Sequence, residues 1–403
     1  MSPLASSVPC QVAPRRRMRR GAALWFNASV MIAFLAASTA PSPLYALYRD
    51  AWGFSALTLT AVFAVYAIAL LGALIVFGGL SDHRGRREVL TIGLAIEIVA
   101  VLVFWQAQSV AWLFAARALQ GLATGIATSA LSAGLLDLDR ERGALLNSVA
   151  PLVGMAVGAL GTGALAEFAP APTRLVYVLL LAVFAAQAIA ARHLPETVTK
   201  QPGALASLRP KLVVPPRARA TLWQVLPVNT ATWALGGFYA SLGPTLGRVV
   251  TGLHSATLGG GVVASLVLSG AVAIVLVRTR PPRVALAAGA GALAVGIVVT
   301  LAGVQTSSTA LFFAGSVVAG LGFGAAFNGS VRSVVPLAEP HERAGLMSTY
   351  YAVSYLAFSL PAMVAGVSSG RVGLVPTALG YGVVLVVMAA AALVAMALRR
   401  SRA

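Results

Sequence analysis

Long apolar segments follow one another along nearly the whole chain, and they limit its possible folds more than any other feature. Each segment is about 19–24 residues long and is bounded by charged residues, Gly or Pro. A helix of about 20 residues crosses the hydrocarbon core of a bilayer, and lipid offers no partner to the backbone of an open strand. The chain is therefore predicted to be an all-α membrane protein.

Twelve transmembrane helices are expected, in two sets of six. The first set lies near residues 22–42, 56–79, 88–107, 110–133, 144–167 and 172–192. The second set lies near residues 222–246, 254–277, 284–304, 309–333, 344–367 and 374–397. The expected organisation is a basic N-terminal tail (1–20), a six-helix bundle (21–193), a linker rich in Pro and basic residues (194–221), a second bundle (222–398) and a short basic tail (399–403).

Composition supports a membrane location and argues against several other classes. Hydrophobic residues make up 59% of the 403 residues and charged residues 10%, whereas soluble domains contain about 25% charged residues. The net charge of +18 does not predict nucleic-acid binding, because the arginines separate apolar segments instead of clustering with aromatic residues. Cys10 is the single cysteine, so no disulfide forms within the chain. No residue cluster predicts a metal site, a cofactor or an enzyme.

The first apolar segment follows a run of arginines, as the apolar region of a signal peptide does. At about residues 21–42 it is longer than such a region and long enough to span a bilayer. We therefore expect a helix that is retained.

Basic residues predict the orientation in the membrane. They concentrate in alternate connections, near residues 15–20, 84–87, 140–142, 192–219, 278–283, 332–343 and 399–402. The other connections contain Arg49, Arg174, Arg248 and Arg371. Because basic loops stay on the cytoplasmic side, we expect a multi-pass protein of the cell (inner) membrane with both termini in the cytoplasm.

The two halves of the sequence also resemble each other. FAARALQGLATG (114–125) corresponds to FAGSVVAGLGFG (313–324), and ERGALLNS (141–148) corresponds to ERAGLMST (342–349). Parallel repeats of this kind characterise one class of secondary transporter.

The stretch FGGLSDHRGRREVL (77–90) connects the second and third expected helices. Gly85 is expected to allow the sharp turn, and Gly78 to let another helix approach closely. A basic connecting loop accounts for the arginines but not for the acidic Asp82.

Gly78-x-Leu80-x-Asp82-His83-x-Gly85-Arg86-Arg87-x-x-Leu90 resembles the signature loop of the major facilitator superfamily, with His83 where an arginine is usual. Leu194-Pro195-Glu196-Thr197 is similar to the family's motif after the sixth helix, and Arg117-x-x-Gln120-Gly121 resembles its second motif. The resemblance extends over the whole chain and is strongest to the twelve-helix drug/proton antiporters. It implies two bundles that rock about a central cavity.

The resemblance also implies a conformational latch at this loop. In the outward-open state, Asp82 would hold the two halves together through Arg86, Asp137 and the start of the helix near Ala344. A carboxylate that faces a helix N-terminus is stabilised by the helix dipole, so a few such contacts can bias an equilibrium between two packings.

Polar groups within the expected helices are candidates for coupling. Arg117 and Gln120 lie in the fourth helix, and an arginine there should face a cavity or a partner, or extend to the outer interface. Glu97 is the carboxylate placed at the middle of a span, which suits a proton carrier or a locally hydrogen-bonded group. Asp50 is an alternative carrier or an ordinary loop charge.

Two further sets of residues are candidates. Gly154, Gly158, Gly161 and Gly163 partly resemble an antiporter motif of the fifth helix, although small residues also serve helix packing. Residues of the later helices are expected to line a mixed aromatic and polar cavity, with Pro244 breaking the seventh helix. The candidates for this lining are Asn229, Thr230, Trp233, Tyr239, Asn328, Tyr351 and Tyr355.

These observations favour a monomeric secondary transporter that exports small amphipathic or drug-like compounds in exchange for protons. Its expected partners are the small-molecule substrate, protons and the lipid bilayer. Uptake of a small metabolite by proton symport remains an alternative within transport. A membrane sensor that does not transport is the alternative from another class.

Overall fold

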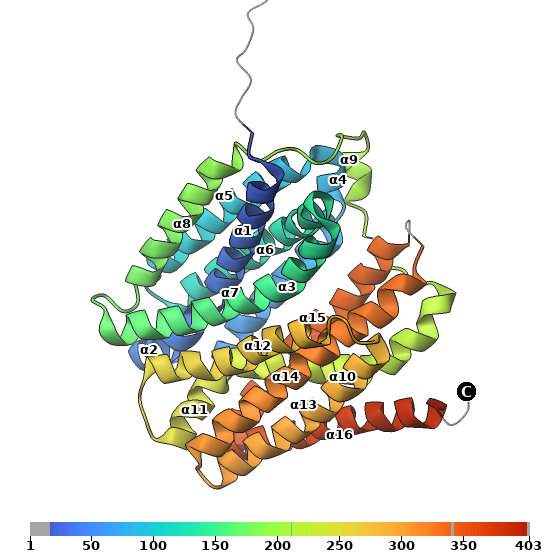
Figure 1. The fold of residues 1–403 in the computed structure, drawn as a ribbon. Coiled ribbons are helices and arrows are strands. Elements are labelled where there is room, and N and C mark those ends of the chain that lie inside the picture. Colours follow the sequence, from blue (N-terminus) through green and yellow to red (C-terminus); the bar gives the residue numbers. More distant parts are fainter. Residues whose placement is uncertain (1–16, 211, 340–341, 401–403) are drawn as a thin grey trace, which may run out of the picture.

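The computed structural model describes residues 17–210, 212–339 and 342–400, and their regular structure is helical throughout (Figure 1). The N-terminal half contains α1 (Arg20–Thr39), α2 (Pro41–Trp52), α3 (Ala56–Phe77), α4 (Leu80–Arg84), α5 (Arg86–Trp105), α6 (Val110–Leu138), α7 (Arg140–Phe168) and α8 (Leu175–Ala191). The linker contains α9 (Ala204–Ser207). The C-terminal half contains α10 (Pro216–Ser241), α11 (Gly243–Thr251), α12 (Ala256–Val277), α13 (Pro282–Gln305), α14 (Thr309–Val334), the 3₁₀ turn η1 (Val335–Leu337), α15 (Arg343–Val372) and α16 (Leu374–Arg400).

The helices agree with the expected all-α membrane fold. Ten helical segments among the described residues are long and apolar enough to cross a membrane, with α1 and α2 counted as one. The remaining two expected spans correspond to α8, which has 17 residues, and to α10 with α11, a more polar segment that contains Asn229, Thr232 and Tyr239. The N-terminal tail, apart from residues 17–20, and residues 401–403 of the C-terminal tail lie outside the described part.

The first span of each half is broken next to a proline, which has no N–H to donate and so removes one hydrogen bond of a regular helix. α1 gives way to α2 at Pro41, and α10 gives way to α11 before Pro244. Each short second helix ends at a glycine with positive φ, Gly53 at 65° and Gly252 at 68°. The expected break at Pro244 is present, whereas the continuation of the first span to residue 52 was not expected.

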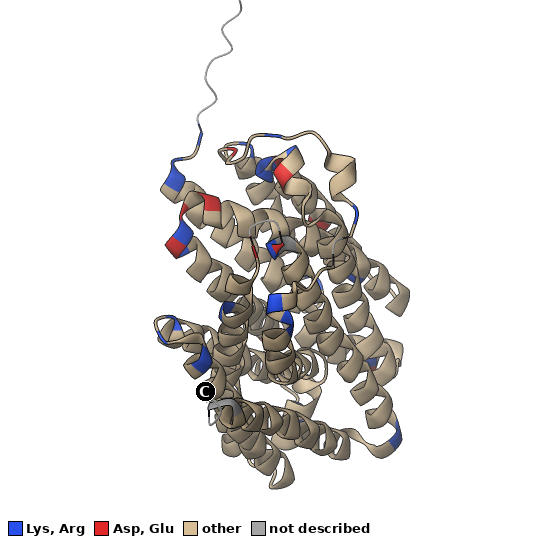
Figure 2. Cartoon of the chain, turned by 90° about the vertical axis from the view of Figure 1, so that its right-hand side faces the viewer, with Lys and Arg blue, Asp and Glu red and all other residues tan. Residues whose placement is uncertain are grey.

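The two halves lie beside each other in Figure 1, with the blue-to-green half at the upper left and the yellow-to-red half at the lower right. They meet where α3 packs against α15 and where α7 packs against α12. We call the end at which α1, α5, α7, α10, α13 and α15 begin the basic end. Figure 2 shows many of the charged residues of the N-terminal half gathered at that end, whereas most of the remaining ribbon is uncharged.

Exposed tryptophans lie near both ends of the spans. Trp25 and Trp223 lie in the second turns of α1 and α10, near the basic end, and Trp105 and Trp112 lie at the opposite end of α5 and α6. Amphipathic aromatic rings prefer the interfaces of a bilayer, so these positions fit the two boundaries of a membrane.

The helices α13 and α14 interlock through glycines at seven-residue intervals. Gly289, Gly296 and Gly303 of α13 lie against α14, and Gly315, Gly322 and Gly329 of α14 lie against α13. At each of them an added Cβ would collide with the facing backbone. A seven-residue period keeps one stripe on the contact face of two slightly crossed helices, and small residues let the backbones approach closely. This pair of stripes was not expected from the sequence.

Gly296→Leu is predicted to destabilise the protein, because the Cβ position meets the backbone of Ala319. Overpacking of a close contact typically costs about 1–3 kcal/mol, so the melting temperature of the purified protein in detergent should fall clearly. Gly291→Leu is the matched control on the same helix, since no atom lies within 4 Å of its Cβ position. Equal melting temperatures for the two variants would contradict the interlocking role.

Candidate functional site

A cavity of about 780 Å³ lies between the two halves. Its walls come from α1, α3, α6 and α7 on one side and from α10, α12, α14 and α15 on the other. This volume lies within the range of small-molecule sites, and the location between two packed bundles is the one expected from the sequence repeats.

The cavity reaches the surface at the basic end. Asp82 and His83 of the loop line it there, together with Pro202 and Arg209 of the linker. The Asp82 side chain is 57% exposed, and Pro202 and Arg209 are exposed as well. The structure is therefore open to solvent at the basic end.

The opposite end is closed by direct contact between the halves. A Cβ at Gly260 of α12 would collide with the carbonyl oxygen of Ala159 in α7, and a Cβ at Gly366 of α15 would collide with Thr60 of α3. At this end of the cavity, the rings of Phe63 and Phe358 pack across the boundary with their centroids 5.0 Å apart. Thr60, Ala159, Gly260 and Gly366 are not part of the cavity lining, so the cavity ends before these contacts.

Polar contacts add to this closure. The Glu167 carboxylate, at the end of α7, accepts hydrogen bonds from the Ser255 hydroxyl (2.6 Å) and from the Thr257 amide (3.0 Å) at the start of α12. A carboxylate at a helix N-terminus pairs with unsatisfied N–H groups and with the positive end of the helix dipole. Asp50 of α2 and Arg248 of α11 also face each other across the boundary, at 4.0 Å.

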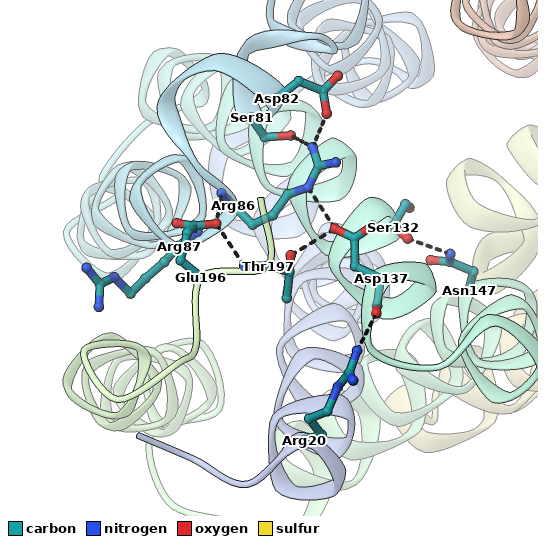
Figure 3. A network of polar contacts seen from close by, with 10 residues as sticks. All are labelled: Arg20, Ser81, Asp82, Arg86, Arg87, Ser132, Asp137, Asn147, Glu196 and Thr197. Atoms are coloured by element: carbon teal, nitrogen blue, oxygen red, sulfur yellow. Dashed lines mark hydrogen bonds and ion pairs between the residues drawn. The ribbon is translucent and has the colours of Figure 1, made fainter. Parts of the chain in front are cut away.

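At the basic end, Arg86 is the centre of a network within the N-terminal half (Figure 3). Its guanidinium contacts the Asp82 carboxylate at 2.5 Å and the Asp137 carboxylate at 3.2 Å, and it donates a hydrogen bond to the Ser81 hydroxyl at 2.6 Å. The Thr197 hydroxyl donates to the same Asp137 carboxylate at 2.8 Å. The network joins α4, α5, α6 and the start of the linker.

Glu196 of the linker caps the first turn of α5. Its carboxylate accepts hydrogen bonds from the amides of Arg86 (2.8 Å) and Arg87 (3.3 Å). Gly85 makes this possible in two ways, because its φ is +102° and because a Cβ there would lie 2.5 Å from a Glu196 carboxylate oxygen. The Arg87 guanidinium points away from the network in Figure 3. The motif that contains Glu196, which follows α8, is thus hydrogen-bonded to the loop motif. The sequence did not reveal this contact.

One expectation about this loop needs correction for the observed conformation. Gly78 does not contact a neighbouring helix, since a Cβ there would meet the carbonyl of Leu74 in its own helix and no other helix within 4 Å; it lines the cavity instead. Among the described residues, Asp82 pairs with Arg86 of its own loop and makes no ion pair or hydrogen bond with the start of α15. The latch was expected for the outward-open state, so it stays a prediction. His83, the departure from the family pattern, has its Nδ1 3.0 Å from the Pro202 carbonyl oxygen.

A second polar cluster is buried within the N-terminal half. Arg117 is 0% exposed, so it does not extend to the interface. Its guanidinium donates to the Tyr45 hydroxyl (2.6 and 2.7 Å), to the Ser38 carbonyl oxygen (2.6 Å) and to the Gln120 side-chain oxygen (2.7 Å). Its central carbon also lies 5.3 Å from the centroid of the Tyr66 ring.

Glu97 belongs to the same cluster. It is 0% exposed, and one of its oxygens accepts a hydrogen bond from the Gln120 amide at 3.2 Å. The other oxygen is buried without a hydrogen-bond partner in the described part of the chain. Gln120 therefore connects the carboxyl group of α5 to the guanidinium of α6.

The cluster and the cavity are separate but adjacent. Arg117, Gln120 and Glu97 do not line the cavity, whereas Tyr66, whose ring lies beside Arg117, does. Ser38 lines the cavity as well, and its carbonyl oxygen holds Arg117. Tyr66 was not among the candidates from the sequence, because the sequence of an apolar helix does not show which of its faces lines a cavity.

Some of the expected lining residues line the cavity and others do not. Tyr351, with Trp233 and Tyr355, lines the cavity. Asn229 does not, because its amide binds Ser354 and Tyr350 between α10 and α15. The other expected residues outside the lining are Thr230, Tyr239, which bonds with Ser316, and Asn328, which accepts from Arg332.

The glycines of α7 have different surroundings. Gly154 and Gly158 lie against the backbone of α1, Gly163 lies against the start of α12, and Gly161 has no atom within 4 Å of its Cβ position. Three of the four therefore serve close helix packing, and one of these contacts crosses between the halves.

Glu167→Gln is predicted to loosen the closed end, because a neutral amide loses the charge-assisted bonds to the start of α12. Spin labels at Leu57 and Val372, both exposed at that end, should report a larger share of long distances. Asp50→Asn is the control, and we expect a smaller change because its 4.0 Å contact with Arg248 is poorer. Unchanged distances in Glu167→Gln would contradict this role.

Comparison with solved structures shows the same fold in two transporters. The nucleoside transporter NupG matches with a TM-score of 0.72 and 12% identity over 94% of this chain and 100% of that chain. The human organic anion transporter MFSD10 (TETRAN) matches with a TM-score of 0.64 and 18% identity over 93% of this chain and 100% of that chain. A search of curated protein sequences finds no match. The sequence model of the Major Facilitator Superfamily matches residues 26–295, and the chain therefore belongs to this family of multi-pass membrane transporters.

Proposed function

We propose that this protein exports small amphipathic compounds in exchange for protons, by alternating access. The observation that carries the proposal is the cavity between the halves, open at the basic end and closed at the other by contacts between α7 and α12 and between α3 and α15. With basic loops on the cytoplasmic side of an inner membrane, this conformation faces inward and is ready to load substrate from the cell.

The composition of the cavity wall supports an amphipathic substrate. Aromatic side chains of α10, α14 and α15 make up much of one wall, and hydroxyl and amide groups of α6 and α7 occur on the other. The two similar structures carry nucleosides and organic anions according to their names. Their low identity gives no reason to assign either substrate to this chain.

The buried cluster supports proton coupling. Glu97 is a fully buried carboxyl group with one unpaired oxygen, and Gln120 links it to Arg117. A buried carboxyl group that changes its charge alters the balance of such a cluster strongly, because the local dielectric is low. Tyr66 and Ser38 contact both the cluster and the cavity, so substrate in the cavity and the charge on Glu97 would influence each other.

The loop network supplies the proposed control of the conformational change. In this inward-facing state, Asp82, Arg86 and Asp137 are held within one half. When the basic end closes, the start of α15 would approach this loop and complete the latch. The linker lines the opening and is bound to the start of α5 by Glu196 and Lys200, the latter through Glu88 at 2.7 Å.

Glu97→Gln is predicted to abolish proton coupling. Purified protein is reconstituted into liposomes with a pH dye inside, and gradients of neutral, cationic and anionic aromatic compounds are applied. For exchange, entry of a compound should raise the internal pH, and the variant should reduce that response by at least about tenfold, because an amide does not take up the proton. Asp50→Asn, an exposed carboxylate of the same half, is the control and should respond as the wild type does.

The same assay distinguishes the alternatives. Internal acidification on entry of a compound would establish symport and overturn the proposed exchange. No pH response or flux with any compound would favour a protein that does not transport. A full response in Glu97→Gln would exclude this carboxyl group as the proton carrier.

Asp82→Asn is predicted to slow transport without unfolding the protein. The side chain is exposed and makes one ion pair within its own loop, and exposed pairs contribute little to stability, about 0–1 kcal/mol. The melting temperature should therefore stay unchanged while the initial rate of transport falls. Glu141→Gln neutralises another exposed acid at the same end of the N-terminal half and should leave the rate nearly unchanged; a normal rate in Asp82→Asn would refute the latch.

A further inference from the structure

We propose that the cavity selects uncharged molecules that carry a planar aromatic ring, with the ring against the C-terminal half and a hydrogen-bonding edge toward the N-terminal half. This inference rests on the proposed transport function and names its substrate class. It depends on three features of the cavity: an aromatic wall, a polar wall facing it, and the position of the charged groups.

The aromatic wall is built around Trp233 of α10. The centroid of its ring lies 4.9 Å from that of Tyr355 and 6.0 Å from those of Phe327 and Phe358. The neighbouring rings meet Trp233 at steep angles of 63–79°. Such edge-to-face clusters accept a further planar ring well, because ring edges and faces carry opposite partial charges.

The polar wall comes from α6 and α7. Thr124, Thr128 and Ser132 follow one another at four-residue intervals, so they share one face of α6, and all three line the cavity. Asn147 of α7 lies beside them and donates its amide N–H to the Ser132 carbonyl oxygen at 3.0 Å (Figure 3). This wall therefore offers short hydroxyl and amide groups, which bind the polar edge of a neutral molecule.

Among the described lining residues, the charged side chains are Asp82, His83 and Arg209, and all three lie at the opening of the cavity at the basic end. A cation in the deep part would find no carboxylate among the described lining residues, and the positive charge of Arg117 lies behind the wall, 5.3 Å from the centroid of the Tyr66 ring. An anion would find no free cationic donor, because the Arg117 guanidinium is already bound to Tyr45, Ser38 and Gln120. An unpaired ion loses its hydration without compensation, so both are disfavoured.

Two buried polar atoms of the walls lack a hydrogen-bond partner among the described residues. They are Nε1 of Trp233, a donor, and Oδ1 of Asn147, an acceptor. Both atoms are enclosed by their neighbours, so their side chains must turn to meet a ligand. An unpaired buried polar atom is unfavourable, and a ligand with both an acceptor and a donor would satisfy the two atoms. Trp233 and Asn147 are therefore assigned as specificity residues.

The test measures equilibrium binding to the full chain in lipid nanodiscs, with tritium-labelled probes and empty nanodiscs as background. Three probes share one ring and differ in charge: 1-naphthalenemethanol, 1-naphthoate and 1-naphthylmethylammonium. A fourth, decahydronaphthalenemethanol, keeps the hydroxyl group but has no aromatic ring. We expect the neutral aromatic alcohol to bind at least about tenfold more tightly than the other three, in line with the strength of aromatic contacts and of ion desolvation.

Variants identify the walls. Trp233→Ala should weaken binding of the neutral alcohol by about tenfold, and Trp233→Phe, which keeps a ring, by less. Trp223→Ala is the matched control, because this tryptophan lies on the same helix and is 73% exposed outside the cavity. Asn147→Ala should weaken binding of 1-naphthalenemethanol and leave that of 1-methylnaphthalene, which has no hydroxyl group, unchanged.

The proposed substrate class would be overturned if either charged probe bound as tightly as 1-naphthalenemethanol. It would also be overturned if the saturated alcohol bound equally well, or if 1-naphthalenemethanol showed no measurable binding. An equal effect of Trp223→Ala and Trp233→Ala would overturn the assigned wall. The binding measurement does not depend on flux, so it tests the substrate class independently of the proposed transport function. Selective binding without compound flux or compound-driven pH change would refute transport alone, and transport with a preference for charged probes would refute the substrate class alone.

Discussion

Lipid offers no hydrogen-bond partners, and this constraint governs both the backbone and the polar side chains of the protein. Within the spans the backbone is helical, and where proline interrupts the first span of each half, the chain resumes a helix at once in α2 and α11. Arg117 is subject to the same requirement. It is fully buried, and it is held by a tyrosine hydroxyl of α2, a backbone carbonyl of α1 and a glutamine of its own helix.

Close helix packing follows from the same environment, because apolar side chains gain little by leaving lipid for another helix. The halves of the protein use glycine for two different purposes. Between α13 and α14 the glycine stripes create a contact inside one half, whereas Gly163, Gly260 and Gly366 close the cavity between the halves. The second kind of contact would have to separate for the cavity to open on that side.

Two carboxylates perform similar tasks at the two ends of the molecule. Glu196 holds the start of α5 within the N-terminal half, and Glu167 holds the start of α12 across the boundary between the halves. The first contact keeps the loop and linker together in the observed conformation, and the second helps to keep the opposite end closed. The asymmetry between them agrees with a cavity that is open on one side only, and it gives the proposed latch at Asp82 a counterpart that sequence motifs did not mark.

The sequence by itself determined the membrane class, the all-helical fold, the two halves and the family, because apolar length, repeats and the loop motif are local properties of the chain. It also pointed to Arg117, Gln120 and Glu97, since polar groups stand out in apolar helices. Only the tertiary structure decided that these three meet in one cluster behind Tyr66, that Asn229 and Tyr239 pack between helices instead of lining the cavity, and that Glu167 bridges the halves. The physical reason is that the facing of each side chain depends on how helices far apart in the sequence pack, and the apolar patterns of buried and lipid-facing surfaces are too alike to reveal it.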